Sequence, residues 1–357
     1  MEARKQQAKL VLEDGSIFYG YSFGSKKPVT GEVVFNTGMV GYPESLTDPS
    51  YSGQILVLTY PLIGNYGIPD NKIEENLLKF FESDKIQVQG LIISDYSNNY
   101  SHWNAKKSLS KWMKEYNIPG IYNIDTRELT KKLRSKGTML GKIIYDNEKI
   151  SLEDPNKRNL ASEVSIKEPI IYKKGKKRVI LVDLGVKNNI IRAFLRRNYT
   201  VVRVPYDYNF LKEKADGVVI SNGPGDPKNC KETIEHVKIA LSKNIPILGI
   251  CLGSQILALA AGADTYKLKY GHRSQNQPCL ESGTNRCYIT TQNHGYAVDS
   301  NTLSEDWREW FFNNNDETNE GIIHISKPFF GTQFHPEASP GPDDTEFLFD
   351  MFIRSMK

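Results

Sequence analysis

The sequence predicts an α/β protein with a mostly β, mixed N-terminal domain over residues 1–150 and a second domain, over residues 178–357, built on a largely parallel sheet flanked by helices. Three observations support this prediction. The 357 residues are enough for two hydrophobic cores. The first half carries short β-type runs separated by Gly- and Pro-rich loops. From Val179 onward, short apolar runs alternate with helical patterns, as in β-α-β units. The polar stretch 151–177, which contains two prolines, is expected to be the linker.

The N-terminal domain shows mainly strand patterns. A turn at Glu13-Asp14-Gly15 predicts a β-hairpin over 9–21. Further strands are expected at 32–37, 54–60 and 90–94, and helices at 74–81, 108–116 and 125–136. The last of these begins with a capping-box pattern, Asp125 followed by Glu128. The Gly- and Pro-rich loops between the strands are either structural corners or a binding surface, and composition alone favours corners.

The second domain shows the alternation of a parallel sheet. Strands are expected at 179–184, 200–205, 217–221, 245–250 and 328–334, with helices at 188–198, 231–243 and 252–261. In sheets of this kind, ligands bind beyond the carboxyl ends of the strands. Three loops lie at such ends: Asn222–Pro227 (NGPGDP), the turn at Cys251, and Phe334–Glu337 (FHPE).

The turn at Cys251 has the pattern of a nucleophile. Gly249-Ile250-Cys251-Leu252-Gly253 is a G-x-C-x-G sequence between an apolar strand and a Leu/Ala-rich helix. It is the cysteine counterpart of the G-x-S-x-G elbow, a strained turn that needs glycines where a Cβ would clash. Such a turn places the thiol at a helix N-terminus, which favours thiolate. The alternative is a cysteine that packs as a small apolar residue.

A cysteine nucleophile needs a base and a group that orients this base. His335 follows a strand, so we expect it at the same sheet edge as Cys251, and Glu337 lies two residues further on. The alternative is a surface His and Glu at a strand end. His294 is a rival base, although the neighbouring Asn293 and Gly295 suggest instead a loop that lines a pocket.

Attack on a carbonyl also builds negative charge on oxygen, which backbone N–H groups can stabilise. The loop Gly223-Pro224-Gly225 lets the chain come close enough to donate, and the N–H of Leu252 is the second expected donor. A G-P-G sequence alone is also an ordinary turn.

Composition excludes several classes of protein. A formal charge of +4, from 46 basic and 42 acidic residues, gives no case for nucleic-acid binding. No run of eighteen apolar residues suggests a membrane span. The four cysteines form no C-x-x-C pair, so we expect free thiols and no metal site. Residues 1–9 are basic without a following apolar segment, and we therefore expect a cytoplasmic protein.

Two sets of motifs resemble known families. NGPGDP, GICLGSQ and QFHPE, in this order, resemble the class I glutamine amidotransferase domain. GEVVFNTGMVGYPESLTDPSYSGQILVLTYPLIGNYG (31–67) and IDTRELTKKLRSKG (124–137) resemble the small subunit of carbamoyl phosphate synthetase. The style of residues 319–350 is similar to the versions within eukaryotic multifunctional pyrimidine-pathway proteins, so the chain is either a free subunit or a domain of a fused protein.

The resemblance implies a mechanism. Cys251 would attack the side-chain amide of glutamine, form a glutamyl thioester and release ammonia, with His335 shuttling protons, Glu337 behind it, and Leu252 and Gly223 as oxyanion donors. Eight residues on matching positions would hold L-glutamine: Ser50, Gly223, Gly225, Leu252, Gln255, Asn293, Gly295 and Tyr296. The chain itself would need no cofactor. Its partner, a large synthetase subunit or fused synthetase domain that uses ATP, Mg²⁺ and bicarbonate, would turn the ammonia into carbamoyl phosphate for pyrimidine or arginine synthesis. The lack of a G-x-x-x-x-G-K-[ST] loop agrees with ATP chemistry elsewhere.

The sequence departs from the family pattern at one position, since Ser254 stands where the family usually has His. An ammonia-dependent mitochondrial variant of the family has lost the cysteine, whereas this chain retains Cys251. Two other classes of function compete with a glutaminase: a catalytically silent scaffold or regulator of the synthetase, and a stand-alone cysteine hydrolase. Retention of Cys251, His335 and Glu337 together argues against the first, and the large N-terminal domain argues against the second.

Overall fold

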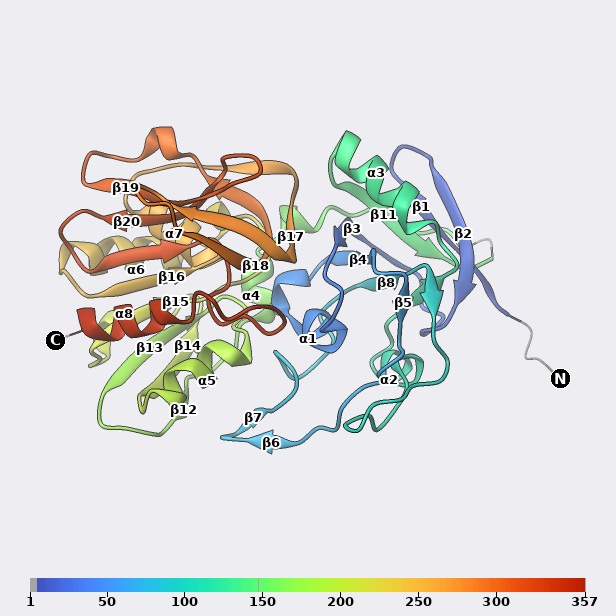
Figure 1. Ribbon diagram of the computed structural model, residues 1–357, viewed down its shortest axis with the longest axis horizontal. Helices are drawn as coiled ribbons and strands as arrows, with labels where there is room; N and C mark the ends of the chain where they lie inside the picture. Colours follow the sequence, from blue (N-terminus) through green and yellow to red (C-terminus); the bar gives the residue numbers. More distant parts are fainter. Residues whose placement is uncertain (1–4, 147, 357) are drawn as a thin grey trace. The chain divides into compact units, whose positions relative to one another are not determined.

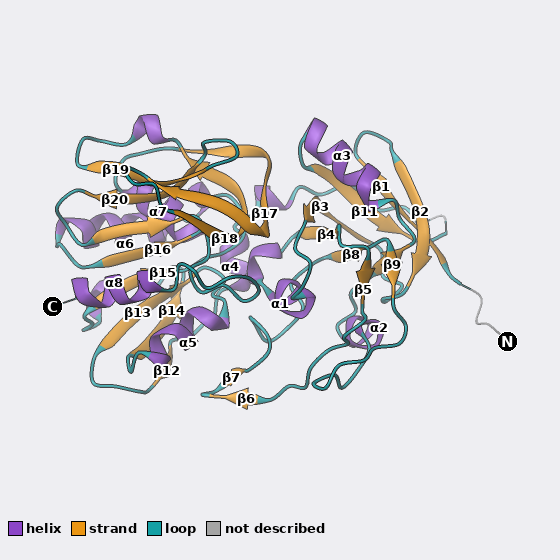
Figure 2. Ribbon diagram, viewed as in Figure 1, coloured by secondary structure: helices purple, strands orange, loops and turns teal. Residues whose placement is uncertain are grey.

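A computed structural model describes residues 5–146 and 148–356 (Figures 1 and 2). The chain divides into two compact units, Met1–Lys157 and Arg158–Lys357. The segment expected as a linker, 151–177, spans this division: helix α4 (Leu160–Val164) and strand β12 (Ile170–Tyr172) lie within the second unit. Residues 1–4 of the basic N-terminal segment, which contributed to the expectation of a cytoplasmic protein, lie outside the described residues.

The first unit is built on a closed β-barrel, in the order β1-β11-β3-β4-β8-β10-β2. Its strands are β1 (Gln7–Leu12), β2 (Ile17–Ser22), β3 (Val29–Asn36), β4 (Gln54–Leu58), β8 (Gly90–Ile92), β10 (Gly120–Tyr122) and β11 (Met139–Ile144). β1 and β2 form the predicted antiparallel hairpin, in which Gln7 pairs with Tyr21. The barrel is mixed, because β3-β4, β4-β8 and β8-β10 pair in parallel while the other pairs are antiparallel. The expectation of a mostly β, mixed domain is confirmed.

The described residues of this unit form three α-helices: α1 (Tyr42–Thr47), α2 (Leu109–Glu115) and α3 (Thr126–Lys136). Two of them lie where the sequence predicts helices. The capping pattern at the start of α3 is present, since the Asp125 side chain accepts a hydrogen bond from the Glu128 N–H at 2.8 Å. α2 packs its buried Trp112 against Phe81, with 5.4 Å between ring centroids.

The prediction of a helix at 74–81 is wrong. This segment contains two short antiparallel strands, β6 (Ile73–Glu74) and β7 (Leu77–Leu78). The two residues between them, Glu75 and Asn76, have φ values of 52° and 63°. A two-residue hairpin turn of type I′ needs positive φ at both positions, and asparagine tolerates that conformation well. A second small pair, β5 (Leu62–Ile63) with β9 (Asp95–Tyr96), is parallel.

In the second unit, ten strands of the described chain form one sheet, in the order β12-β14-β13-β15-β16-β21-β20-β19-β17-β18. Its predicted central strands, β13 (Arg178–Asp183), β14 (Thr200–Pro205), β15 (Gly217–Ile220), β16 (Ile247–Ile250) and β21 (Phe329–Thr332), pair in parallel. Antiparallel strands continue the sheet beyond β21: β17 (Thr265–Glu281), β18 (Cys287–Val298), β19 (Trp307–Asn313) and β20 (Asn319–His324). No prediction covered these four strands.

Helices cover both faces of the parallel strands. α6 (Lys231–Ser242) and α7 (Leu252–Ala260) share a hydrophobic core with Val218 and Ile220 of β15. α8 (Phe347–Ser355) lies against the opposite face, because a Cβ on Gly217 would be 2.9 Å from the ring of Phe352 and successive residues of a strand point to opposite faces. α5 (Asn188–Arg196) packs on α8 through Phe194 and Phe349. The α/β expectation is confirmed, and Figure 2 shows this layering.

No helix among residues 5–146 and 148–356 is both long enough and apolar enough to cross a membrane.

Candidate active site

Cys251 and His335 stand at the carboxyl ends of neighbouring parallel strands. β16 pairs with β21 so that Ile250 lies opposite Thr332, and the Cys251 N–H donates to the Thr332 carbonyl at 2.7 Å. The chain therefore leaves β16 at Cys251 beside the point where it leaves β21 toward His335. This edge of a parallel sheet is where ligand sites form.

The backbone at Cys251 is held in a strained turn. Its φ of 54° and ψ of −107° lie outside the regions that non-glycine residues normally adopt. The turn requires the two glycines of the motif: a Cβ on Gly249 would lie 2.5 Å from the Gly253 carbonyl oxygen, and one on Gly253 would lie 2.0 Å from the Ile220 oxygen. Cys251 is the N-cap of α7, where the helix dipole favours negative charge on the sulphur.

His335 and Glu337 form a buried pair. His335 Nδ1 lies 2.7 Å from Glu337 Oε1, and both side chains are at most 1% exposed. Burial lowers the pKa of His335, and the charge of Lys187 lowers it as well, but Glu337 and Cys251 together raise this pKa to about 10. Burial would raise the pKa of Glu337, yet the charges of Lys187 and His335 lower it to about 2. His335 Nε2 is buried, and Cys251 interacts electrostatically with the His335 side chain.

Lys187 completes this group and was missed by the sequence analysis. Its ammonium lies 3.1 Å from Glu337 Oε1, donates to the Ala338 carbonyl, and is 2% exposed. Lys187 follows β13, whose carboxyl end lies at the same sheet edge. A lysine just beyond a strand of a parallel sheet was the signal available in the sequence. The charges of Lys187, Glu337 and protonated His335 alternate in sign along the row that ends at Cys251.

The Gly-rich loop lies against the elbow. A Cβ on Gly223 would be 2.1 Å from the Leu184 carbonyl oxygen and 2.9 Å from the Leu252 side chain, so only glycine fits. Gly225 has a φ of 89°. Leu252 is the first residue of α7, and its N–H is one of the helix N–H groups without an intrahelical partner.

Four of the expected glutamine-binding residues are brought together around Cys251. Gln255 lies on α7, and its amide donates to the Tyr296 carbonyl at 2.8 Å. Asn293, Gly295 and Tyr296 lie on β18, and the Asn293 carbonyl is 3.7 Å from Cys251 Sγ. Ser50 belongs to the first unit, where it lies in a short 3₁₀-helix (Pro49–Tyr51) and its N–H donates to Asp48 Oδ1. Its part in glutamine binding stays a prediction.

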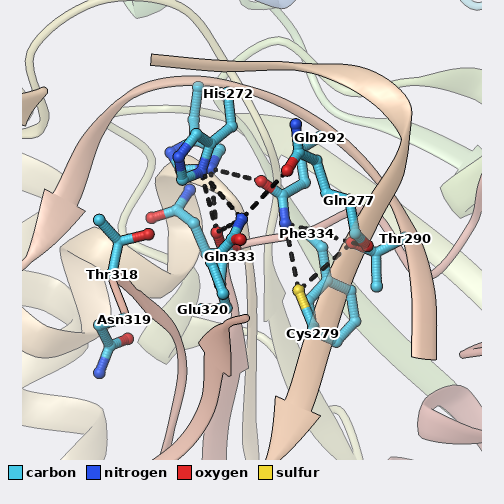
Figure 3. Close-up of polar contacts among 12 residues, drawn as sticks. His272, Gln277, Cys279, Thr290, Gln292, Thr318, Asn319, Glu320, Gln333 and Phe334 are labelled. Atoms are coloured by element: carbon cyan, nitrogen blue, oxygen red, sulfur yellow. Dashed lines mark hydrogen bonds and ion pairs between the residues drawn. The ribbon is translucent and has the colours of Figure 1, made fainter. Parts of the chain in front are cut away.

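His294, the rival base, points into a different network, whose members His272, Glu320 and Gln292 are labelled in Figure 3. Its Nδ1 lies 2.8 Å from the Tyr296 carbonyl oxygen and its Nε2 lies 3.2 Å from Gln292 Oε1. Burial lowers the pKa of His294. With both ring nitrogens engaged, His294 is arranged to hold the strand that carries Asn293 and Gly295.

Among the described residues, His272, His294 and Glu320 form a group that could hold a metal, since each offers a ligand atom within 4.8 Å of the others. They are, however, linked to one another and to Asp316. His272 Nδ1 lies 3.0 Å from Glu320 Oε1, and its Nε2 lies 2.8 Å from Asp316 Oδ2. A protonated His272 pairs with both carboxylates and offsets one of their two negative charges. The expectation that the chain holds no metal stays a prediction.

Ser254 lies one turn into α7 and is 1% exposed. Its side chain packs on the backbone of β21, where a Cβ on Gly331 would lie 2.6 Å from Ser254 Oγ. All four cysteines are free, and only Cys287 is exposed.

Comparison with known proteins gives two family matches. The family "Glutamine amidotransferase class-I" matches residues 180–355, and "Carbamoyl-phosphate synthase small chain, CPSase domain" matches residues 10–143. The multifunctional protein CAD of Squalus acanthias is 55% identical over 353 residues, which cover 97% of this chain and 16% of that protein. The multifunctional protein pyr-3 of Neurospora crassa is 50% identical over 384 residues, with 97% and 21% covered.

The human mitochondrial carbamoyl-phosphate synthase [ammonia] is 50% identical over 362 residues, which cover 100% of this chain and 24% of that protein. The chain thus spans a quarter or less of the length of these relatives. The two matched families account for both structural units, the barrel and the ten-stranded sheet. The chain belongs to the family that joins a carbamoyl-phosphate synthase small-chain domain to a class I glutamine amidotransferase domain.

Proposed function

We propose that this chain is the glutamine-hydrolysing part of a carbamoyl phosphate synthetase, and that it releases ammonia from L-glutamine by means of Cys251, His335 and Glu337. The observation that carries the proposal is the position of Cys251 at the N-terminus of α7, in a strained turn, beside the buried His335–Glu337 pair. A buried cysteine with only a packing role needs neither the strained backbone nor the adjacent ion pair.

The charges support a ground state in which the sulphur is a thiolate and His335 is an imidazolium. The pKa of His335 is raised to about 10 by Glu337 and Cys251, against the effect of burial, so the ring holds its proton at neutral pH. The thiolate attacks the side-chain carbonyl carbon of glutamine, and the C–N bond breaks as His335 gives its proton to the leaving nitrogen, which departs as ammonia. Water then cleaves the glutamyl thioester, with neutral His335 as base, and glutamate leaves.

Leu252 and Gly223 are the proposed donors to the oxyanion that forms at each attack. Leu252 offers the free N–H of a helix start, and Gly223 lies against the Leu252 side chain without a Cβ in the way. Gly225, Gln255, Asn293, Gly295 and Tyr296 are the proposed contacts to glutamine from the second unit, and Ser50 the proposed contact from the first.

The proposed partner is a synthetase, as a separate subunit or as a fused domain, that combines the ammonia with bicarbonate and ATP in the cytoplasm. The family of the first unit supports a synthetase partner. The proposed pathway is the synthesis of pyrimidines, with arginine as a further product. This proposal rests on the resemblance of the sequence motifs and not on the names of the multifunctional relatives.

The test is ammonia release from glutamine by the purified chain and by Cys251→Ala. We expect release by the wild type and none by the variant, while a complex of Cys251→Ala with its synthetase still makes carbamoyl phosphate from added ammonia. Glutaminase activity of Cys251→Ala within a few-fold of wild type would refute the role of the elbow. A silent wild type, alone and in the complex, would favour the scaffold alternative.

A further inference from the structure

Gln333 is a buried residue next to the reacting sulphur for which the reaction above has no role. It follows β21 directly, two residues before His335, and is 1% exposed. Its N–H donates to the Glu320 carbonyl at 2.8 Å, which fixes the backbone to β20. Its side-chain amide lies between Gln255 Nε2, at 2.9 Å, and Cys251 Sγ, at 3.6 Å. Gln333 is among the residues labelled in Figure 3.

The orientation of this amide follows from a neighbouring carbonyl. The backbone oxygen of Tyr296 can only accept a hydrogen bond, so Gln255 must turn its NH₂ group toward it. The second hydrogen of this NH₂ group points to Gln333, which must therefore present its oxygen to Gln255. The NH₂ group of Gln333 is left facing Cys251 Sγ. A flipped amide at either glutamine would bring two acceptors together.

The same pair of groups occurs once more in the chain. Gln292 Nε2 donates to Cys279 Sγ at 3.2 Å, and its orientation is set by Thr290, whose hydroxyl donates to the Gln277 carbonyl. Burial raises the pKa of Cys279 well above its usual range, while its hydrogen bonds with Thr290 and Gln292 act in the opposite direction. An amide donor thus favours thiolate, but it does not by itself make a buried cysteine reactive.

Cys251 differs from Cys279 in its other neighbours. It caps α7, and the titratable group that faces it is His335, with Glu337 and Lys187 behind. The Asn293 carbonyl, 3.7 Å from the sulphur, can accept from the neutral thiol and so acts against the thiolate. A neutral donor on the other side of the sulphur offsets this carbonyl.

We propose that Gln333 is a further catalytic residue, whose amide N–H donates to Cys251 Sγ and stabilises the attacking thiolate. This role rests on the proposed function, since it serves the same nucleophile. Gln255 is the positioning residue behind it, because Gln255 links the Gln333 amide to the Tyr296 carbonyl and so fixes which end of that amide the sulphur meets.

The experiment measures the rate at which iodoacetamide alkylates Cys251, by mass spectrometry of the peptide, across a series of pH values. Thiolate displaces iodide and thiol does not, so the half-maximal pH reports the thiolate without any need for glutamine. In Gln333→Leu we expect this half-maximal pH to rise by roughly one to two pH units, the usual worth of a hydrogen bond to a charged group. In Gln333→Glu it should rise at least as far, because a carboxylate oxygen replaces the N–H.

Two controls come from the chain itself. The exposed Cys287 is an internal reference whose profile should stay in place in every variant. Gln292→Leu removes a buried amide donor from Cys279 and should leave the Cys251 profile where it is in wild type. We also expect kcat of Gln333→Leu to fall at neutral pH and to recover as pH rises, which a purely structural role would not produce.

An unmoved or lowered half-maximal pH for Cys251 in folded Gln333→Leu overturns the proposal. If Gln333→Leu does not fold, as judged by circular dichroism, the nearly isosteric Gln333→Glu decides, and an unmoved profile there overturns it equally. Failure of the proposed function would be recognised separately, because the alkylation assay needs no glutamine. Even if the wild type released no ammonia, the half-maximal pH of alkylation could still be compared between wild type and Gln333→Leu.

Discussion

Lys187 Nζ lies 3.1 Å from Glu337 Oε1, the same carboxylate oxygen that accepts the hydrogen bond from His335 Nδ1 at 2.7 Å. The three side chains are at most 2% exposed. The carboxylate is therefore shared between two cations. The charge of Lys187 lowers the pKa of His335, whereas the charge of Glu337 raises it. With the thiolate proposed above, the four charges sum to zero, which makes their burial tolerable.

Removal of Lys187 should destabilise the second unit strongly. In Lys187→Met, Glu337 keeps one buried partner instead of two, and breaking a buried ion pair typically costs about 3–5 kcal/mol of unfolding free energy. Chemical denaturation measures the loss. The control is Lys228→Met, because Lys228 pairs with Asp264 at the surface, where such a pair contributes about 0–1 kcal/mol. Similar small losses in both variants would contradict the buried pairing.

His335→Asn should reduce kcat far more than Glu337→Gln does. Loss of the imidazole removes proton transfer to the leaving nitrogen, which typically contributes ~10²–10⁴-fold. Glu337→Gln keeps a hydrogen-bond acceptor for Nδ1 and mainly loosens the orientation of the ring. Steady-state glutaminase kinetics at saturating glutamine make the comparison. Small and equal effects on kcat from both changes would return the role of base to His294.

The buried His272 should make stability depend on pH. Burial lowers its pKa, but Asp316 and Glu320 raise it from 6.5 to about 9. A raised pKa in the folded state means that the protonated His272 contributes fully below about pH 6.5 and that this contribution is lost as pH rises through about 9. His272→Gln should therefore be less stable than wild type by on the order of 2 kcal/mol near pH 6, and the gap should narrow above pH 9. Denaturation midpoints of both proteins measured over this range check it, and a gap independent of pH would show that His272 stays neutral.

The first unit should couple synthetase occupancy to glutamine hydrolysis. Free ammonia is wasted unless synthesis is ready, and the sequence of this unit shows no catalytic motif. We expect glutaminase kcat/KM to rise when the synthetase is added and again with ATP and bicarbonate, by roughly 5–150-fold in all. Ser50→Ala should blunt the rise. Equal rates in the three conditions, with the complex confirmed by sizing, would leave this unit as a passive dock.

The parallel half of the second unit could be predicted closely because its strands are short apolar runs. Thr200–Pro205 and the helix that starts at Leu252 lie where the alternation indicates. The antiparallel half gave no such signal. Strand β17 is seventeen residues long, contains three basic residues, and changes register with β18 after Lys267 and after Ser274. Such an irregular strand breaks the period of two on which strand prediction depends.

The residues of the candidate site likewise divide into those that the sequence predicts and those that it does not. Cys251, His335 and Glu337 follow from motifs in which chemistry and spacing coincide. Lys187 and Gln333 do not, because their importance arises from burial beside residues that are distant in the chain. Lys187 lies 150 positions from Glu337, and Gln333 is 82 positions from Cys251, so only the sheet order β13-β15-β16-β21 brings them together.

The most direct test of the account is to capture the covalent intermediate. Wild-type protein is mixed with labelled glutamine, quenched in acid within the first turnover, and digested, and the labelled peptide is identified by mass spectrometry. We predict a glutamyl thioester on Cys251, more of it in His335→Asn if deacylation slows more than acylation, and none in Cys251→Ala. Turnover of glutamine with no label on the Cys251 peptide, or with label on another residue, would contradict the assignment of Cys251 as the nucleophile.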